Sequence, residues 1–423
     1  MNWESVSKRV EEEESYVVDV LRGLIRIDTS VPPGNNYGKL MDLLEPEFKR
    51  FGCTTQRVLV PEDRDRMDAM KLSGARENLI ASLASGKPPV SVYAHTDVVP
   101  ADDSWSYDPF GAEIVDGKLY GRGSVDDKGP IACVLGALKV MHELGLEPKF
   151  SIDCLLCTDE EIGGQYTAGS EYLAENGYFS NHLIWLDLGA VEPVYVIGTA
   201  GSIQVDVTAL GKSCHSGMNF LGINALEEMV PILNELTALK KEVEQRQSRI
   251  PSFPHPESPF THGKMTPMFN MTVIHGGTKI NIVPSECKLS IDRRTIVDED
   301  PEEVIAEIKE RVHRGKEKSK LLDVKVDVVR GYGAAEIDSD TPAVHKMKAA
   351  VKAVKGFEDL IFGGMSGSSD IASVAEALKP KKLEVAHFGV ARVGDLRAHG
   401  VDEFVYVEDL VTVTKELIHY FCF

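Results

Sequence analysis

The segment CTDEEIGG, residues 157–164, places two glutamates side by side directly after an apolar run. The run, residues 150–156, has the length and composition of a buried strand. Adjacent carboxylates repel each other, so Glu160 and Glu161 gain little as a structural pair. At the end of a strand they can instead move protons or bind a divalent cation. This segment is therefore a candidate for chemistry.

A second polar cluster contains His95 and Asp97 and follows the apolar residues 90–94. Residues two apart in a strand share a face, so the Asp97 carboxylate can accept a hydrogen bond from the His95 ring. Such a carboxylate fixes the tautomer of a metal-bound imidazole and raises its basicity. A histidine that merely satisfies the end of a strand is the structural alternative for this motif taken alone.

Three further polar segments stand at expected element boundaries. Asp126 and Asp127 precede a helix predicted over 128–145, and two aspartates exceed what one N-terminal cap requires. Asp187 ends another apolar strand, and His399 precedes an apolar helix near the C-terminus. In open α/β sheets, binding sites form beyond the carboxyl ends of the strands, so we expect these side chains to meet there.

Two histidines and several carboxylates form a ligand set that suits zinc, cobalt or manganese. One shared aspartate can bridge two ions about 3.5–4 Å apart, as in hydrolytic two-metal sites. Two rival motifs each lack a glycine that they require. The segment ending in Gly211-Lys212-Ser213 has Asp206 where a phosphate loop requires glycine, and Gly364–Ser368 lacks the closing glycine of a hydrolase nucleophile elbow.

The chain has 423 residues, which predicts two domains. Strand and helix patterns alternate through the first half and predict an α/β sheet with helices on both faces. The following stretch has the β-α-β-β-α-β order of ferredoxin-like units, with strands at 202–209, 268–275, 280–293 and 322–330, helices at 223–240 and 301–314, and a long loop over 244–266. We therefore predict a mixed-sheet α/β domain of residues 1–199 and 334–423, interrupted by a smaller domain of residues 200–333.

The net charge is −20, from 46 basic and 66 acidic residues. This balance opposes binding to nucleic acid or to an anionic membrane. The first residues lack the apolar segment of a secretion signal, and the seven cysteines are scattered without a disulfide framework. We expect a cytoplasmic protein without nucleic-acid or membrane partners.

The chain resembles the metallopeptidase and amidohydrolase family of acetylornithine deacetylase, succinyl-diaminopimelate desuccinylase, aminoacylase, carboxypeptidase G and related dipeptidases. The resemblance covers nearly the whole length. It is carried by the motifs SVYAHTDVVP, GKLYGRGSVDDKGP, CTDEEIGG, NIVPSECKLSIDRR and RAHG.

The resemblance implies a role for each residue of the strand-end clusters. Glu160 would be the general base and acid, Asp97 would orient His95, and a cis peptide would join Asp126 to Asp127. Two divalent ions, zinc in the first place and cobalt or manganese otherwise, would share five protein ligands: His95, Asp126 as the bridge, Glu161, Asp187 and His399.

The inserted domain resembles the lid and dimerisation domain of this family, which implies a homodimer. His215 would reach the active site of the other copy and stabilise the oxyanion. Asn281 and Arg294 would bind substrate, and Gly367 and Ser368 would line the substrate end of the site. The structural alternatives are a loop histidine, a turn asparagine, and a surface arginine paired with Asp292.

The resemblance implies hydrolysis of an amide in an N-acyl amino acid or small peptide, by a metal-bridged water with Glu160 as base. A deacetylase or desuccinylase of amino-acid biosynthesis is one alternative, and a dipeptidase or carboxypeptidase is another. The choice of aspartate at Asp187 leans toward aminopeptidase, dipeptidase or aminoacylase types. A non-catalytic binding protein with the same fold would be expected to lack a ligand or the base, and the sequence lacks neither.

Overall fold

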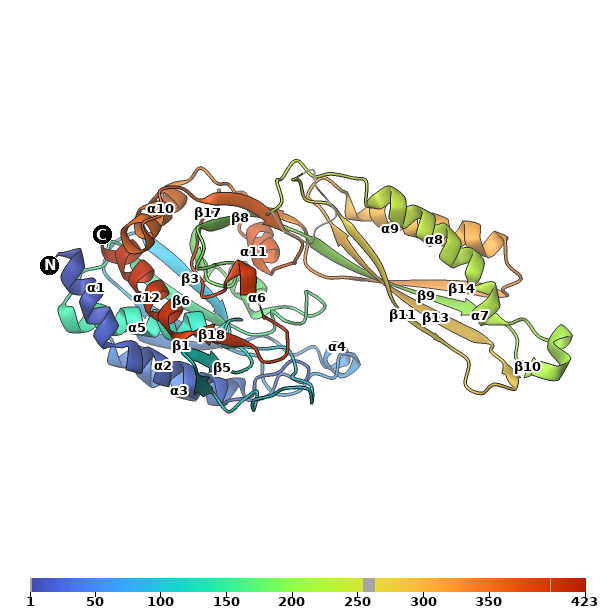
Figure 1. The fold of residues 1–423 in the computed structure, drawn as a ribbon, viewed down its shortest axis with the longest axis horizontal. Coiled ribbons are helices and arrows are strands. Elements are labelled where there is room, and N and C mark those ends of the chain that lie inside the picture. Colours follow the sequence, from blue (N-terminus) through green and yellow to red (C-terminus); the bar gives the residue numbers. More distant parts are fainter. Residues whose placement is uncertain (1, 254–262, 396) are drawn as a thin grey trace. The chain divides into compact units, whose positions relative to one another are not determined.

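A computed structural model describes residues 2–253, 263–395 and 397–423 (Figure 1). Residues 254–262 of the predicted loop 244–266 lie outside this description. The chain divides into two compact units, of which unit 1 comprises Met1–Ile197, Ile337–Phe362 and Ser373–Phe423, and unit 2 comprises Gly198–Glu336 and Gly363–Ala372.

Residues 363–372 therefore belong to unit 2, whereas the sequence pattern predicts that they belong to the larger domain. The Ala200 N–H lies 3.2 Å from the Met365 carbonyl and 2.9 Å from the Gly367 carbonyl and donates to both. These main-chain bonds tie the segment to the start of the inserted region, although the two are far apart in sequence.

Unit 1 is built on a six-stranded mixed sheet. Its order is β1 (Thr54–Leu59), β2 (Glu77–Leu83), β6 (Ser151–Cys157), β3 (Pro89–His95), β7 (His182–Trp185) and β17 (Glu384–His387). Strands β6, β3, β7 and β17 pair in parallel, whereas β1 and β2 make the antiparallel pairs. The carboxyl ends of the parallel strands consequently lie at one edge of the sheet.

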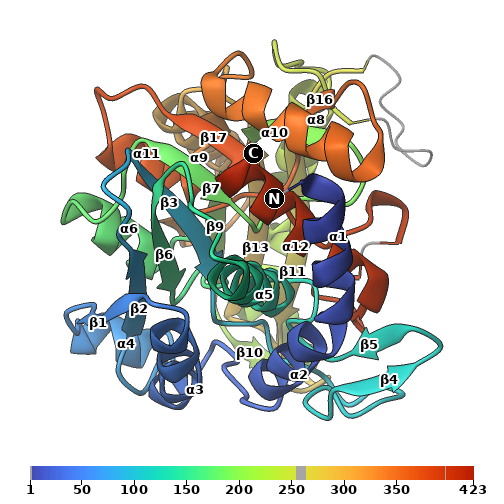
Figure 2. The same cartoon turned by 90° about the vertical axis from the view of Figure 1, so that its left-hand side faces the viewer.

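Helices α1 (Trp3–Glu12), α2 (Glu14–Ile25), α5 (Lys128–Leu144) and α12 (Val407–Cys422) pack together beside this sheet (Figure 2). Helix α5 is buried almost all round because it lies between β3 and its neighbours α2 and α12. The other helical elements are α3 (Tyr37–Arg50), α4 (Arg64–Ala69), α6 (Gly169–Glu175), α10 (Pro342–Lys355), α11 (Ile371–Ala377) and η2 (Val393–Asp395).

The structure also contains two three-stranded sheets. One has the order β18 (Phe404–Tyr406), β5 (Lys118–Tyr120) and β4 (Glu113–Val115), and the other has the order β15 (Ala335–Glu336), β8 (Val194–Thr199) and β16 (Ile361–Met365). The mixed α/β class predicted from the sequence is confirmed. Within the described residues, no helix is both long enough and apolar enough to cross a membrane.

Unit 2 contains a four-stranded antiparallel sheet in the order β11 (Met268–Gly276), β13 (Glu286–Thr295), β9 (Gly201–Leu210) and β14 (Asp323–Arg330). Helices α8 (Val230–Val243) and α9 (Pro301–Glu317) lie side by side on one face of this sheet (Figure 1). The shorter elements are β10 (Cys214–His215), η1 (Ser216–Leu221), α7 (Ala225–Glu228) and β12 (Ile282–Val283).

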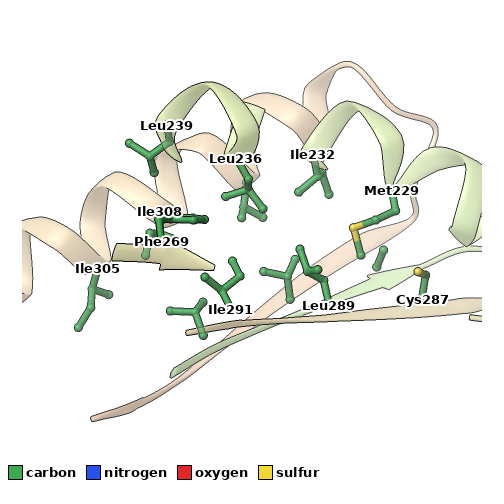
Figure 3. Close-up of a cluster of buried hydrophobic side chains, with 14 of the residues drawn as sticks. Met229, Ile232, Leu236, Leu239, Phe269, Cys287, Leu289, Ile291, Ile305 and Ile308 are labelled. Atoms are coloured by element: carbon green, nitrogen blue, oxygen red, sulfur yellow. The ribbon is translucent and has the colours of Figure 1, made fainter. Parts of the chain in front are cut away.

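The core of unit 2 lies between the two helices and the sheet (Figure 3). Ile232, Leu236 and Leu239 recur at helical spacing and put one face of α8 against the sheet. Residues of β9 alternate between buried and less buried positions, as a strand covered on one face requires.

Prolines divide two elements that are predicted from the sequence to be continuous, the strand at 280–293 and the helix at 223–240. Pro284 separates β12 from β13, because proline has no N–H to donate to a strand ladder. Pro231 lies in the first turn of α8, a position that a helix tolerates only at its start, and so α7 ends before it.

A close approach of α9 to α8 yields a stability prediction. A Cβ atom on Gly315 would lie 2.5 Å from the Cα atom of Ile232, whereas a Cβ on Gly333 would meet nothing within 4 Å. Alanine is favoured over glycine in a helix by about 1 kcal/mol, but overpacking costs about 1–3 kcal/mol, and we expect the clash to win. Gly315→Ala should therefore lower the free energy of unfolding in urea, and Gly333→Ala should leave it nearly unchanged. A Gly315→Ala variant as stable as the parent would contradict the packing described here.

Candidate active site

Three parallel strands deliver polar residues to the same edge of the unit 1 sheet. His95 is the last residue of β3, and its neighbours in the sheet are β6 and β7. Glu160 and Glu161 follow the end of β6, and Asp187 follows the end of β7. The structure thus brings together side chains that the sequence separates by about ninety residues.

Asp126 divides its carboxylate between two histidines. Its Oδ1 atom lies 2.8 Å from His95 Nε2, and its Oδ2 atom lies 3.2 Å from His399 Nε2. Glu161 Oε2 lies 3.0 Å from the same nitrogen of His399. The peptide bond between Asp126 and Asp127 is cis, as the resemblance implies.

These side chains form two sets of candidate metal ligands that share Asp126. The ligand atoms of His95, Asp126 and Asp187 lie within 4.8 Å of one another, and we call this set group 1. The ligand atoms of Asp126, Glu161 and His399 meet the same criterion and form group 2. Imidazole nitrogen and carboxylate oxygen around one shared carboxylate fit a pair of divalent ions.

Asp97 contacts His95 differently from the sequence prediction. The His95 Nδ1 atom lies 3.0 Å from the main-chain carbonyl of Asp97 but 3.8 Å from its carboxylate. The prediction that the carboxylate accepts this hydrogen bond is therefore wrong in this geometry, because residue 97 has left the strand and turned its carbonyl toward the ring. With Nδ1–H donated to this carbonyl, Nε2 is the ring nitrogen that faces Asp126 and can serve as the metal ligand.

The Asp97 carboxylate instead binds the main chain at the glutamate pair. Its Oδ2 atom accepts a hydrogen bond from the Glu161 N–H at 2.9 Å. Glu161 then faces His399, whereas a carboxylate oxygen of Glu160 lies within 4.8 Å of one from Asp187. The side chains of Glu160 and Glu161 consequently point to different residues.

Residues outside the predicted set fix the turn that precedes these glutamates. Asp159 has a φ of 64°, a left-handed conformation that is uncommon outside glycine. Its buried carboxylate lies 3.1 Å from Arg76 Nε and accepts a hydrogen bond from the Tyr37 hydroxyl at 2.8 Å. The guanidinium of Arg76 also donates to the carbonyls of Pro33 and Gly34. No spacing in the sequence connects these segments, so sequence reasoning missed them.

The electrostatics of the site favour added positive charge. Hydrogen bonds donated by the His399 ring to the carboxylates of Asp126 and Glu161 raise the pKa of His399 to about 10. Burial works against a charged His95, yet the hydrogen bond that its ring donates to Asp126 and the charges of the neighbouring aspartates hold the pKa of His95 well above its ordinary value. Burial and the charge of Asp126 raise the pKa of Glu161 to about 7. In the metal-free protein, protons on the histidines thus compensate the carboxylates, a role that divalent ions can take.

The residues expected at the substrate end lie in unit 2. Arg294 on β13 donates a hydrogen bond to the Ser368 hydroxyl at 3.1 Å, and its Nε atom lies 3.2 Å from Asp292. The structure therefore brings Arg294 and Ser368 together and also contains the predicted alternative pairing with Asp292. Gly367 lies next to Ser368 and accepts a main-chain hydrogen bond from Ala200.

His215 and Asn281 are exposed and lie near each other, at the other end of the unit 2 sheet. Strand β10 pairs His215 with Ile282, and the Ser216 N–H donates to the Asn281 carbonyl at 3.0 Å. Arg294, by contrast, pairs with Ser202 at the start of β9, whereas His215 follows the end of that strand. Eight residues of strand correspond to about 26 Å, so one copy of unit 2 does not bring His215 beside Arg294.

Comparison with known proteins agrees with the site. Residues 91–421 match the sequence model of peptidase family M20/M25/M40. A probable succinyl-diaminopimelate desuccinylase of Staphylococcus epidermidis is 29% identical over 354 residues, which cover 79% of this chain and 83% of the relative.

Solved structures show the same fold. Human carnosine dipeptidase 1 has a TM-score of 0.80 at 20% identity, covering 99% of this chain and 98% of the other. An M20 family metallo-carboxypeptidase of Sulfolobus solfataricus has a TM-score of 0.78 at 16% identity, covering 96% and 98%.

The fold and the ligand groups define a metallohydrolase that acts on amide bonds. The chain belongs to peptidase family M20/M25/M40, as the motifs of the sequence indicate.

Proposed function

We propose that this protein uses two divalent metal ions to hydrolyse the amide bond of an N-acyl amino acid, as a deacetylase or desuccinylase does. The observation that carries the proposal is the Asp126 carboxylate, with one oxygen directed at His95 and the other at His399. Asp187 and Glu161 flank the two histidines. This arrangement provides a shared ligand and separate ligands for two ions.

The chain's own residues would hold the ions and move the proton. Group 1 would bind one ion and group 2 the other, with zinc as the first choice and cobalt or manganese as alternatives. Bound ions of this kind polarise a carbonyl and lower the pKa of water. Asp97 would orient His95 through its main-chain carbonyl.

Glu160 would act as general base and then as general acid. Its side chain is 9% exposed, and its carboxylate lies near that of Asp187 without joining either ligand group. It would take a proton from the attacking water and pass it to the nitrogen of the leaving amine. The amide C–N bond is thereby broken, water supplies a hydroxyl to the acyl carbon and a proton to the amine nitrogen, and Glu160 returns to its starting protonation state.

The substrate's free carboxylate would bind Arg294. A guanidinium can grip a carboxylate with two parallel hydrogen bonds, and Ser368 and Gly367 lie beside it in unit 2. Asn281 lies near His215 at one end of unit 2, and it would contact the substrate from there. His215 would donate a hydrogen bond to the oxyanion that forms at the cleaved carbonyl.

A dipeptidase or carboxypeptidase is the second candidate function. Asp187, rather than glutamate, completes group 1, and this choice leans toward dipeptidase and aminoacylase types. The Arg294 site suits both candidates, because an N-acyl amino acid and a dipeptide each end in a free carboxylate. A non-catalytic binding protein is disfavoured, since both ligand groups and Glu160 are present.

A homodimer formed through unit 2 would place His215 at the site of the other copy. The distance along β9 supports this arrangement, because His215 and Arg294 of one chain stand at opposite ends of the strand. Apolar side chains are exposed around His215, with Phe220 78% and Ile280 100% exposed, and both line a hollow at this end. Exposed apolar surface of this kind commonly marks an interface between protein chains. Unit 2 would then serve as the lid and dimerisation domain.

The substrate class can be tested with a hydrolysis panel. We expect chelation to abolish hydrolysis and zinc, cobalt or manganese to restore it. The panel contains N-acetylornithine, N-succinyl-diaminopimelate, N-acyl amino acids and dipeptides, each beside its carboxamide analogue. Arg294→Lys should raise KM for the free acids far more than for the carboxamides, because lysine loses the paired donors. Equal losses on acids and carboxamides would remove Arg294 from the carboxylate site.

Substitution of Glu160 and substitution of Glu161 should have different effects on kcat and on metal content. Glu160→Gln keeps the shape of the side chain and removes the proton acceptor, so kcat should fall by about 10²–10⁴-fold while metal content stays near that of the parent. Glu161→Gln should lower the metal content, because it removes a ligand of group 2. Metal analysis of both purified variants gives the answer. Loss of metal from Glu160→Gln would reverse the assignment.

The role of His215 across the dimer can be tested by mixing inactive variants. Glu160→Gln and His215→Ala should each be nearly inactive as homodimers. Subunits mixed in equal amounts and allowed to exchange should recover about a quarter of the parent activity, because half of the dimers then contain one complete site. A mixture no more active than its two components would contradict catalysis across the dimer.

A further inference from the structure

The carboxylate of Glu403 is buried against the loop that ends in Asp126. Its Oε2 atom accepts hydrogen bonds from Arg122 Nη1 at 2.7 Å and from the Gly123 N–H at 3.2 Å. Its Oε1 atom accepts from the N–H groups of Val125 at 2.9 Å and Asp126 at 3.3 Å. The side chain is 1% exposed, so both of its oxygens serve this loop rather than solvent.

Arg122 extends the same contact to His399. Its Nη2 atom donates to the main-chain carbonyl of His399 at 3.3 Å, and its guanidinium lies 5.0 Å from the ring of Trp105. His399 has a φ of 63°, in the left-handed region that residues with a side chain rarely adopt. Such a conformation persists only where surrounding contacts hold it. The buried pair Glu403–Arg122 therefore contacts the main chain of two ligands of group 2.

Group 1 depends less on this pair. His95 ends the central strand β3, its Nδ1 contacts the Asp97 carbonyl, and its N–H donates to Asp127 at 3.2 Å. Asp187 is the second residue after β7, which pairs with β3. Two of the three ligands of group 1 are thus held by the sheet, and only the shared Asp126 depends on the Glu403 carboxylate.

We propose that Glu403 and Arg122 are positioning residues that hold group 2 in its metal-binding geometry. The proposal rests on the two-metal function proposed above and assigns to this pair a selective effect on one of the two ions. Neither residue touches the substrate or the reacting atoms. They act through the main chain of Asp126 and His399.

Substitution of Glu403 by glutamine tests the pair with little change in shape. An amide group has only one acceptor oxygen, so its NH₂ group would face either Arg122 or the N–H groups of Val125 and Asp126. A donor would then face a donor in a buried position. Loss of a residue that supports metal ligands typically weakens metal binding roughly ten- to a hundredfold.

The measurement is calorimetric titration of metal-free protein with Zn²⁺. The parent protein should show two binding events. His399→Ala and His95→Ala identify them, because the first variant removes a ligand of group 2 only and the second a ligand of group 1 only. Glu403→Gln should weaken the group 2 event roughly ten- to a hundredfold and change the group 1 event much less.

Two further variants make the result decisive. Arg122→Lys keeps a positive charge near Glu403 but loses the planar arm that reaches the His399 carbonyl, so it should weaken the same event. Glu408→Gln is the matched control, because Glu408 is an exposed glutamate five residues further along, in α12, and pairs with Arg392 instead. It should leave both events unchanged. Thermal unfolding of each metal-free variant checks that it is folded.

Each outcome decides between the alternatives. Selective weakening of the group 2 event in either folded variant supports the proposal. Equal weakening of both events, or unchanged events in both variants, overturns it. If both variants fail to fold, the pair has a general structural role and the proposal is likewise overturned. A parent protein that binds fewer than two ions would instead refute the proposed two-metal function.

Discussion

The structure depends on one carboxylate that faces two imidazoles. Asp126 offers one oxygen to His95 and the other to His399, so three segments of unit 1 must converge within hydrogen-bonding distance. Negative charge is concentrated here, because Asp97, Asp127 and Glu161 lie close by. Buried charges are costly unless they are paired or hydrogen-bonded. The surrounding fold therefore has to supply partners for each carboxylate and still leave the centre of the site able to accept cations.

Buried groups behind the site supply those partners. Asp97 accepts the Glu161 N–H, Asp127 accepts the His95 N–H, and Glu403 accepts three N–H groups of the Asp126 loop. Main-chain donors satisfy an anion without adding a mobile positive charge. They also transmit orientation, since a carboxylate that binds the backbone of a neighbour limits where that neighbour's side chain can point. Two of the buried arginines, Arg76 and Arg122, are paired with Asp159 and Glu403.

The sequence predicted the convergence of the site but not its supporting contacts. Apolar runs that end in His95, Glu160–Glu161 and Asp187 indicate strand ends, and parallel pairing then brings those ends to one edge. The partners of Asp126 beyond the histidines leave no such pattern. Glu403 lies 277 residues from Asp126, and no periodicity relates a buried glutamate to the loop it binds. The wrong prediction for the Asp97 carboxylate has a similar origin. The spacing of residues along a strand predicts which side chains share a face, but not where the chain leaves the strand.

The adjacent glutamates illustrate how the backbone resolves an electrostatic conflict. In a continuing strand, Glu160 and Glu161 would point to opposite faces of the sheet, and only one of them could serve the site. Strand β6 ends at Cys157, and the left-handed conformation of Asp159, held by Arg76 and Tyr37, turns the chain before the pair begins. The hydrogen bond from the Glu161 N–H to Asp97 then fixes the second residue toward His399, which leaves the first beside Asp187. A pair that would repel in isolation is thus divided between two positions, one beside the His399 imidazole and one beside Asp187, and the turn at Asp159 is what makes different roles for neighbouring carboxylates possible.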